Sequence, residues 1–311
     1  MRTGQGAEVA AALLLDALFG EPPEALHPTV WMGRAISAYE KRALPAMSPL
    51  ARRLAGVVLA SALPILVFLS VRVALGVVPR PLRRVFGAAL ISTAISMRGL
   101  GEAARIVEKE LRADNLEQAR ARVGELVGRD TETLSASEVS RAAVESVAEN
   151  ASDGVVAPML YGLLFGAPGA LAYKAINTLD SMVGYRKGLY EEFGWASARL
   201  DDLANLAPAR TTASAAAITS GRPVRALEAA RRYGRLTASP NAGGVEAAFA
   251  GALGVRLGGP NAYGGVVRQG PILGDGRRPG PEDVRRAVKL MRRCCALVAG
   301  IAVVAGGPRR G

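Results

Sequence analysis

Two long uncharged stretches decide how the chain folds: residues 54–71, LAGVVLASALPILVFLSV, and residues 155–173, VVAPMLYGLLFGAPGALAY. Each is close to the roughly 20 apolar residues that a membrane-spanning helix needs. Shorter apolar runs at 85–97 and 294–307 have arginines at both ends. Proline and glycine are tolerated in membrane helices that pack against neighbours. We therefore predict a mostly α-helical, multi-pass membrane protein. The alternative is a soluble helical protein that buries these runs in its core.

The composition of the 311-residue chain limits the functions it can have. Half of the residues are hydrophobic and the mean hydropathy is +0.20, which excludes a disordered chain. His27 is the single histidine, which excludes a zinc site built from several histidines. Cys294 and Cys295 are adjacent, which excludes a disulfide scaffold and indicates packing residues.

The charge is strongly basic, with 39 Lys and Arg, 27 Asp and Glu, and a formal net charge of +12. No acidic residue occurs between Glu40 and Glu102, where nine are basic. Basic residues collect at the ends of membrane helices, so we expect membrane lipid rather than nucleic acid as a partner. The four basic residues before the first long run and the four after it leave its orientation open.

We expect one membrane-embedded catalytic domain over residues 1–311, with no visible repeat and no alternating β pattern. Its expected segments are apolar spans at 51–100, a charged helical segment at 101–150, site-bearing helices at 155–221, Gly/Pro-rich loops at 234–281 and a C-terminal helix at 282–307. Ser135 and Glu138 match a capping box, which predicts a helix from near Ser135 to about Asn150.

A row of charged residues follows that capping box. Arg141, Glu145 and Glu149 recur every four residues and so share one helix face, and Asp153 would continue the row. Aligned carboxylates repel one another unless a cation lies on them. The row ends beside the apolar run 155–173, which favours a site, although a solvated acidic face is equally compatible with the spacing.

Carboxylates, amides and cations also gather after the second long run. They are Lys174, Asn177, Asp180, Arg186, Asp201, Asp202, Asn205 and Arg210. Carboxylate oxygens and substrate phosphates form the usual Mg²⁺ shell, and Lys or Arg hold phosphates. We predict Asp180, Asp201 and Asp202 as Mg²⁺ ligands, with ordinary surface acids as the alternative.

Glycine-rich segments contain two Pro-Asn pairs, at 240–241 and 260–261, which read as turns. The chain has no phosphate-binding loop of the usual nucleotide-binding patterns. His27 stands before Pro28 in a turn region, where it would act as a base, contact a phosphate or only fix the turn.

The order of these motifs resembles the CobD/CbiB family of cobalamin biosynthesis, the adenosylcobinamide-phosphate synthases. The resemblance covers residues 13–265 and rests on GEPP at 20–23, HP at 27–28, GRDT at 128–131, AAVESVAEN at 142–150, DGVVAP at 153–158, KAINTLDSMVGYR at 174–186, FGW at 193–195, RLDD at 199–202, PAR at 208–210, SPN at 239–241 and GVRLGGPN at 254–261.

The resemblance implies a multi-pass inner-membrane enzyme that uses ATP and Mg²⁺ for an amide ligation. Its substrates would be a corrinoid, adenosylcobyric acid, and (R)-1-aminopropan-2-ol phosphate or a related amino alcohol. Other late cobalamin-pathway membrane enzymes are expected partners. The expected catalytic residues are Glu145, Asp153, Asp180, Asp201 and Asp202. The expected binding residues are His27, Arg141, Asn150, Lys174, Asn177, Arg186, Arg210, Asn241 and Asn261.

Two other functions fit the residues without the resemblance. Membrane prenyltransferases combine spanning helices with Asp-rich clusters that bind Mg²⁺ and diphosphate, and Asn177-x-x-Asp180 and Asp201-Asp202-x-x-Asn205 can be read in that way. A membrane accessory or sensor protein without catalysis is the third hypothesis, although the intact acidic clusters argue against it.

Overall fold

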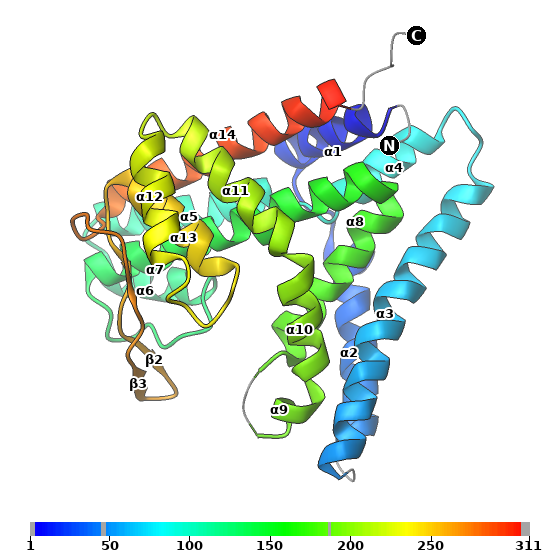
Figure 1. Ribbon diagram of the computed structural model, residues 1–311, viewed down its shortest axis with the longest axis horizontal. Helices are drawn as coiled ribbons and strands as arrows, with labels where there is room; N and C mark the ends of the chain where they lie inside the picture. The colour runs from blue at the N-terminus through cyan, green and yellow to red at the C-terminus, as the bar shows by residue number, and fades with distance from the viewer. Residues whose placement is uncertain (1–3, 45–47, 186–187, 306–311) are drawn as a thin grey trace. The chain divides into compact units, whose positions relative to one another are not determined.

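The computed structural model describes residues 4–44, 48–185 and 188–305 (Figure 1). The described chain is mostly α-helical, as predicted. Its contacts divide it into two compact units. Unit 1 comprises residues 1–96, 157–205 and 299–311, and unit 2 comprises residues 97–156 and 206–298. The prediction of one catalytic domain over 1–311 stays a prediction.

Unit 1 is a helical bundle. Its elements are α1 (Gln5–Phe19), η1 (Glu24–Leu26), α2 (Pro28–Ala43), α3 (Pro49–Val77), α4 (Arg83–Ser92), α8 (Ala157–Val183), α9 (Tyr190–Phe193) and α10 (Trp195–Ala204). Helix α3 packs on α8, α9 and α10. A β-carbon at Gly56 would lie 1.9 Å from the carbonyl oxygen of Phe193, so only glycine lets α3 pass this closely. The core here is formed around Ile36, Leu179 and Phe193.

Two helical stretches are long and apolar enough to cross a membrane by length and composition. Pro49–Val77 has only 22% of its most apolar window buried, whereas Ala136–Val183 has 61% buried. The second stretch is therefore also compatible with a protein core. The multi-pass arrangement that we predicted has only this weak support.

Unit 2 combines helices with two small β ribbons. Its elements are α5 (Met97–Arg112), α6 (Leu116–Gly124), α7 (Ala136–Ala151), the π turn η2 (Ser152–Val156), α11 (Leu206–Thr219), α12 (Pro223–Tyr233), α13 (Ala242–Leu253), β1 (Leu257–Gly258), β2 (Asn261–Tyr263), β3 (Val266–Arg268), β4 (Ile272–Leu273) and most of α14 (Pro281–Ala305). Both ribbons are antiparallel, with β1 paired to β4 and β2 to β3.

The predicted start of α7 is confirmed in detail. The Ser135 hydroxyl accepts a hydrogen bond from the Glu138 amide, at 3.4 Å. The Glu138 carboxylate accepts one from the Ser135 amide, at 2.8 Å. This reciprocal capping box satisfies two backbone donors that a helix start leaves unpaired.

The C-terminal helix is confirmed over its described part, which ends at Ala305. Its two cysteines are not joined in a disulfide and are fully buried, as expected for packing residues. Burial raises the pKa of the Cys294 thiol to about 11.

The expectation of loops over 234–281 is wrong in two places. Helix α13 begins after Asn241, and four short strands follow it. Glycine lowers helix propensity, but here it allows close packing, because a β-carbon at Gly251 would lie 2.8 Å from that of Ala229 in α12. The tertiary contact therefore outweighs the local preference.

The turns of this region also differ in part from the prediction. Pro240-Asn241 forms the expected turn, whereas Pro260 leads into β2. The actual reversal between β2 and β3 lies at Gly264 and Gly265, whose φ angles of 59° and 78° suit a two-residue hairpin turn. The Asp130 carboxylate accepts hydrogen bonds from both glycine amides, at 2.9 and 2.7 Å.

Candidate functional site

Helices α8 and α10 of unit 1 bring together the acidic residues that follow the second apolar run. Ala157 and Tyr173 pack against Ala204, which fixes the end of α10 on α8. The Tyr173 hydroxyl donates a hydrogen bond to Asn205 Oδ1 at 2.7 Å, and both side chains are buried or nearly so. Asn205 in turn donates to Asp201 Oδ2 at 2.9 Å. A chain of side chains therefore holds the Asp201 carboxylate in place.

Asp201 has a strongly raised pKa. Burial raises the pKa of Asp201 to about 7, and the nearby Asp180 carboxylate adds to the shift, while the amides of Asn205 and Asn177 oppose it. Its Oδ1 is buried and has no hydrogen-bond partner among the described residues. A carboxyl group with this pKa can exchange a proton near neutral pH, as a general base requires.

The same arrangement fits a divalent cation. Asp180 and Asp201 repel each other when both are ionised, and a cation between them would remove this repulsion. The same cation could bind Asp201 Oδ1, which has no hydrogen-bond partner among the described residues. Asp202 is partly buried and is ion-paired at 3.8 Å with Arg199, an exposed residue of α10. Within the described residues, no group of three or more His, Cys, Asp or Glu is placed to hold a metal ion. Two carboxylates would therefore supply only part of a Mg²⁺ shell, and substrate phosphates and water would supply the rest.

The other predicted residues of unit 1 lie in different positions. Lys174 is on α8, six residues before Asp180. Arg186 lies outside the described residues. His27 caps α2, where its Nδ1 accepts from the Thr29 amide at 3.2 Å and its Nε2 lies 3.4 Å from Glu21 Oε2. These contacts give His27 a role in fixing the turn.

In unit 2, α7 places Glu145 within a buried ionic network. Glu145 Oε1 accepts a hydrogen bond from the Gly258 amide at 2.6 Å and lies 3.8 Å from Arg141 Nε. Glu145 Oε2 is hydrogen-bonded and ion-paired with Arg129. The carboxylate is thus balanced by two guanidinium groups, each about nine-tenths buried.

The two arginines tie α7 to the chain that leads into β2. Arg141 Nη2 donates to Asn261 Oδ1 at 2.8 Å and to the Pro260 carbonyl at 3.0 Å, and Nη1 donates to the Gly258 carbonyl. Arg129 also donates to Asn261 Oδ1. The structure therefore brings Asn261 next to two predicted site residues of α7, Arg141 and Glu145, although Asn261 lies more than 100 residues away in the sequence.

The remaining predicted residues of unit 2 are Arg210, Asn241, Asn150 and Asp153. Arg210 and Asn241 are paired, with Arg210 Nη1 donating to Asn241 Oδ1 at 2.7 Å. Asn150 turns back on its own helix and donates to the Ser146 carbonyl at 3.0 Å. Asp153 lies in the π turn beyond the end of α7, so the regular row of charged residues within α7 ends at Glu149.

Sequence reasoning missed Glu246 and Arg129. Burial, followed by the nearby Glu145 and Glu149 carboxylates, raises the pKa of Glu246 well above its ordinary value. This shift favours the neutral form of Glu246 over its carboxylate. The sequence could have indicated Glu246, because it is the one acidic residue between Glu228 and Asp275 and lies in an otherwise apolar segment, where an acid is unusual.

These features define a helical protein with an unbalanced carboxylate pair in one unit and a balanced buried ion network in the other. The family model described as CobD/Cbib protein matches residues 9–291. The chain is 45% identical to the Cobalamin biosynthesis protein CobD of Geobacter metallireducens, with 97% of each chain covered. It is 44% identical to the protein of that name from Chromobacterium violaceum, with 94% of each covered. The protein of that name from Rhodobacter capsulatus is 43% identical, with 96% of this chain and 97% of the relative covered.

The chain belongs to the CobD/CbiB family, and the resemblance that we drew from its motifs is confirmed. No solved structure matches the chain.

Proposed function

We propose that the protein acts in cobalamin biosynthesis and joins adenosylcobyric acid to (R)-1-aminopropan-2-ol phosphate, or a related amino alcohol, to give adenosylcobinamide phosphate with consumption of ATP. The names of its relatives support the pathway. The observation that carries the chemistry is Asp201, a buried carboxyl group with a pKa of about 7 beside Asp180.

The reaction requires two steps that a carboxylate site can assist. A carboxylate oxygen of the corrinoid attacks the γ-phosphorus of ATP, the bond to ADP breaks, and an acyl phosphate forms. The amine nitrogen then attacks the acyl carbon, and inorganic phosphate leaves with the electron pair of the carbon–oxygen bond. Carboxylate, ammonium and ATP thus give amide, ADP, phosphate and one proton.

The residues of this chain would contribute mainly by accepting a proton from the amine and by neutralising the charge of the phosphates. The amine is protonated at neutral pH and must lose a proton before it attacks, and Asp201 is poised to accept it. Mg²⁺, when held by Asp180 and the substrate phosphates, would supply positive charge to the transferring phosphate and leave Asp201 to accept the proton. Lys174, Arg186 and Arg210 remain candidates for phosphate contacts, and Arg210 is held by Asn241.

We also propose that the protein is located at the inner membrane through α3. Large apolar side chains are exposed along this helix, including Leu54, Val58, Leu66 and Val73, each at least 56% exposed. Exposed apolar surface of this extent is typical of lipid or protein contact. Retention in the membrane fraction after carbonate washing is expected. Release by carbonate would contradict integral insertion.

The ligation is tested with the purified full-length protein, adenosylcobyric acid, ATP, Mg²⁺ and the amino-alcohol phosphate. We expect a product whose mass equals the two substrates less water, with one ADP formed per product. Omission of any component should abolish it. A prenyl diphosphate with an acceptor forms the second arm, and turnover there without ligation would favour the prenyltransferase.

A genetic test separates the enzyme from an accessory protein. A deletion strain should grow on cobinamide but not on cobyric acid, and the intact gene should restore growth on cobyric acid. Restoration by an Asp201→Asn variant that has no ligation activity in vitro would favour the accessory role.

A further inference from the structure

A small basic cavity lies within unit 2, beside the ionic network of α7. Its volume is about 210 Å³, and it is lined by the first turn of α7, by Arg141, by β1 with the residues around it, and by Arg278 and Pro279. Three arginines, Arg141, Arg256 and Arg278, line it against one acid, Glu138. The cavity therefore has a clear excess of positive charge.

Two of the three arginines, Arg256 and Arg278, have side chains that the protein does not engage, whereas Arg141 already donates to Gly258, Pro260 and Asn261. Within the described chain, the side chains of Arg256 and Arg278 make no hydrogen bond or close ion pair, although Arg278 and Arg141 act electrostatically on Glu138. The Glu138 carboxylate is already bound to the amide and hydroxyl of Ser135, at 2.8 and 2.7 Å. Two exposed guanidinium groups thus converge where the one nearby acid is held by the helix cap.

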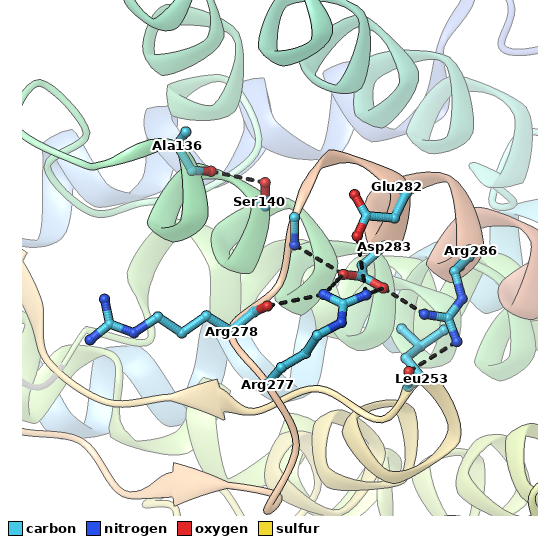
Figure 2. A network of polar contacts seen from close by, with 9 residues as sticks. Ala136, Ser140, Leu253, Arg277, Arg278, Glu282, Asp283 and Arg286 are labelled. Atoms are coloured by element: carbon cyan, nitrogen blue, oxygen red, sulfur yellow. Dashed lines mark hydrogen bonds and ion pairs between the residues drawn. The ribbon is translucent and has the colours of Figure 1, made fainter.

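The loop that carries Arg278 is held by a buried anchor (Figure 2). Asp283 is fully buried and accepts hydrogen bonds from Arg277 at 2.6 and 3.0 Å and from Arg286 at 2.7 Å. Arg277 Nη1 also donates to the carbonyl of Arg278, at 3.0 Å. Figure 2 shows the Arg278 side chain extending away from this network. The anchor fixes the backbone of Arg278 and leaves its guanidinium group available.

The second exposed arginine is tied to the same loop. The Arg256 amide donates to the Arg277 carbonyl at 2.9 Å, and Val255 and Arg277 form a parallel β bridge. Gly259 has a φ of 91°, and a β-carbon there would lie 3.1 Å from Arg141 Nη1, so glycine allows the backbone to approach the buried guanidinium group. The three arginines are therefore placed by backbone contacts before any ligand arrives, which lowers the entropic cost of binding.

We propose that this cavity binds the phosphate group of a phosphorylated ligand. Guanidinium groups recognise phosphate through paired, charge-assisted hydrogen bonds. The cavity of about 210 Å³ is several times the ~30 Å³ share of one water molecule and smaller than the roughly 300–1,000 Å³ of pockets for drug-sized ligands. It thus suits a phosphate with a short attached chain rather than a whole corrinoid. This inference does not depend on the amide ligation.

The test measures binding directly, with the full-length protein in detergent. Inorganic phosphate, 1-aminopropan-2-ol phosphate and ATP without metal are titrated by calorimetry, with unphosphorylated 1-aminopropan-2-ol as the control ligand. The variants are Arg256→Ala, Arg278→Ala and Arg278→Lys. Arg231→Ala, which removes an exposed arginine of α12 outside the cavity, is the matched control. Thermal unfolding of each variant checks that it is folded.

We expect inorganic phosphate to bind the native chain and the Arg231→Ala variant equally, and about tenfold or more weakly to Arg256→Ala and Arg278→Ala. Arg278→Lys should retain part of the affinity. If the cavity variants weaken binding of inorganic phosphate and of the amino-alcohol phosphate but not of ATP, the natural ligand of the cavity is a phosphate monoester. If the cavity variants weaken binding of inorganic phosphate and of ATP but not of the amino-alcohol phosphate, the natural ligand is the nucleotide. Equal phosphate affinity in all variants, or no phosphate binding to the native chain, would overturn the proposal.

Discussion

The two carboxylate clusters of the molecule differ in how their charge is balanced. In unit 2, Glu145 faces two arginines and a backbone amide, and its oxygens are all engaged. In unit 1, Asp201 faces a second carboxylate, Asp180, and leaves Oδ1 without a partner among the described residues. Buried charges that are paired hold a fold together, whereas buried charges that are not paired are costly unless a ligand or proton completes them. We therefore expect the first cluster to contribute mainly to stability and the second to be the better candidate for chemistry.

Removal of Glu145 should have the largest effect on stability. Glu145→Ala leaves Arg129 and Arg141 buried without their anion, which we expect to cost about 3–5 kcal/mol. Thermal unfolding in detergent measures it, with Glu117→Ala on the exposed face of α6 as the matched control. A loss no greater than that of the control would show that Glu145 is not a structural partner.

Asp201→Asn should have the opposite effect to Glu145→Ala, with a loss of activity and no loss of stability. The amide keeps the shape but accepts no proton, so we expect ligation to fall about 10²–10⁴-fold while stability is kept or gained, because the repulsion with Asp180 disappears. Initial rates of ligation and unfolding temperatures are measured on the same preparation. Glu24→Gln, an exposed acid of unit 1, is the control. Full activity in Asp201→Asn would remove Asp201 from the mechanism.

The raised pKa of Asp201 also predicts how stability changes with pH. The folded group binds its proton up to a pH of about 7, whereas the unfolded group releases it near 3.8. The folded state therefore gains most at low pH, and this contribution, on the order of 4 kcal/mol, is lost as the pH rises from about 4 to 7. The difference in unfolding temperature between the native chain and Asp201→Asn, measured from pH 4.5 to 8, should follow this curve. A difference that stays constant over that range would contradict it.

Glu246→Gln should have the smallest effect. Burial and the nearby carboxylates raise the pKa of Glu246 well above its ordinary value, so the folded protein favours the neutral acid there. A neutral amide should therefore change the unfolding free energy by less than about 1 kcal/mol at pH 7. Denaturant unfolding tests it beside Glu145→Ala. A loss as large as that of Glu145→Ala would mean that Glu246 is ionised within the network.

Local patterns predicted the parts of the fold that local physics controls. The helix after Ser135 follows from the capping box, and the C-terminal helix follows from a run without breakers. Helix α13 was not predictable in this way, because its glycines are explained by packing against α12, which lies outside the local sequence. The β2–β3 turn at Gly264-Gly265 was overlooked because the short strands show too little alternation to mark it.

The candidate site was predictable to a similar degree. Residue types and spacing suggested Asp180, Asp201 and Asn177, and the structure places these three together. Spacing could not show that Arg141 and Glu145 bind residues more than 100 positions away, such as Gly258. The pairing that distinguishes a balanced acid from an unbalanced one arises only from such long-range contacts.

The break in α8 changes how the apolar sequence relates to a bilayer. The stretch Ala136–Val183 has 48 residues, which as one straight helix would extend ~72 Å, more than twice the ~30 Å of a hydrocarbon core. The π turn at 152–156 and Gly166, with its φ of 70°, divide it. The pieces of α8 on either side of Gly166 reach only roughly 14 and 26 Å. Helix α3, with 29 residues, is therefore the one candidate span in the described chain that crosses such a core in a single helix. The apolar run 155–173 has the length of a spanning helix in sequence, but the π turn and Gly166 prevent it from forming one straight helix.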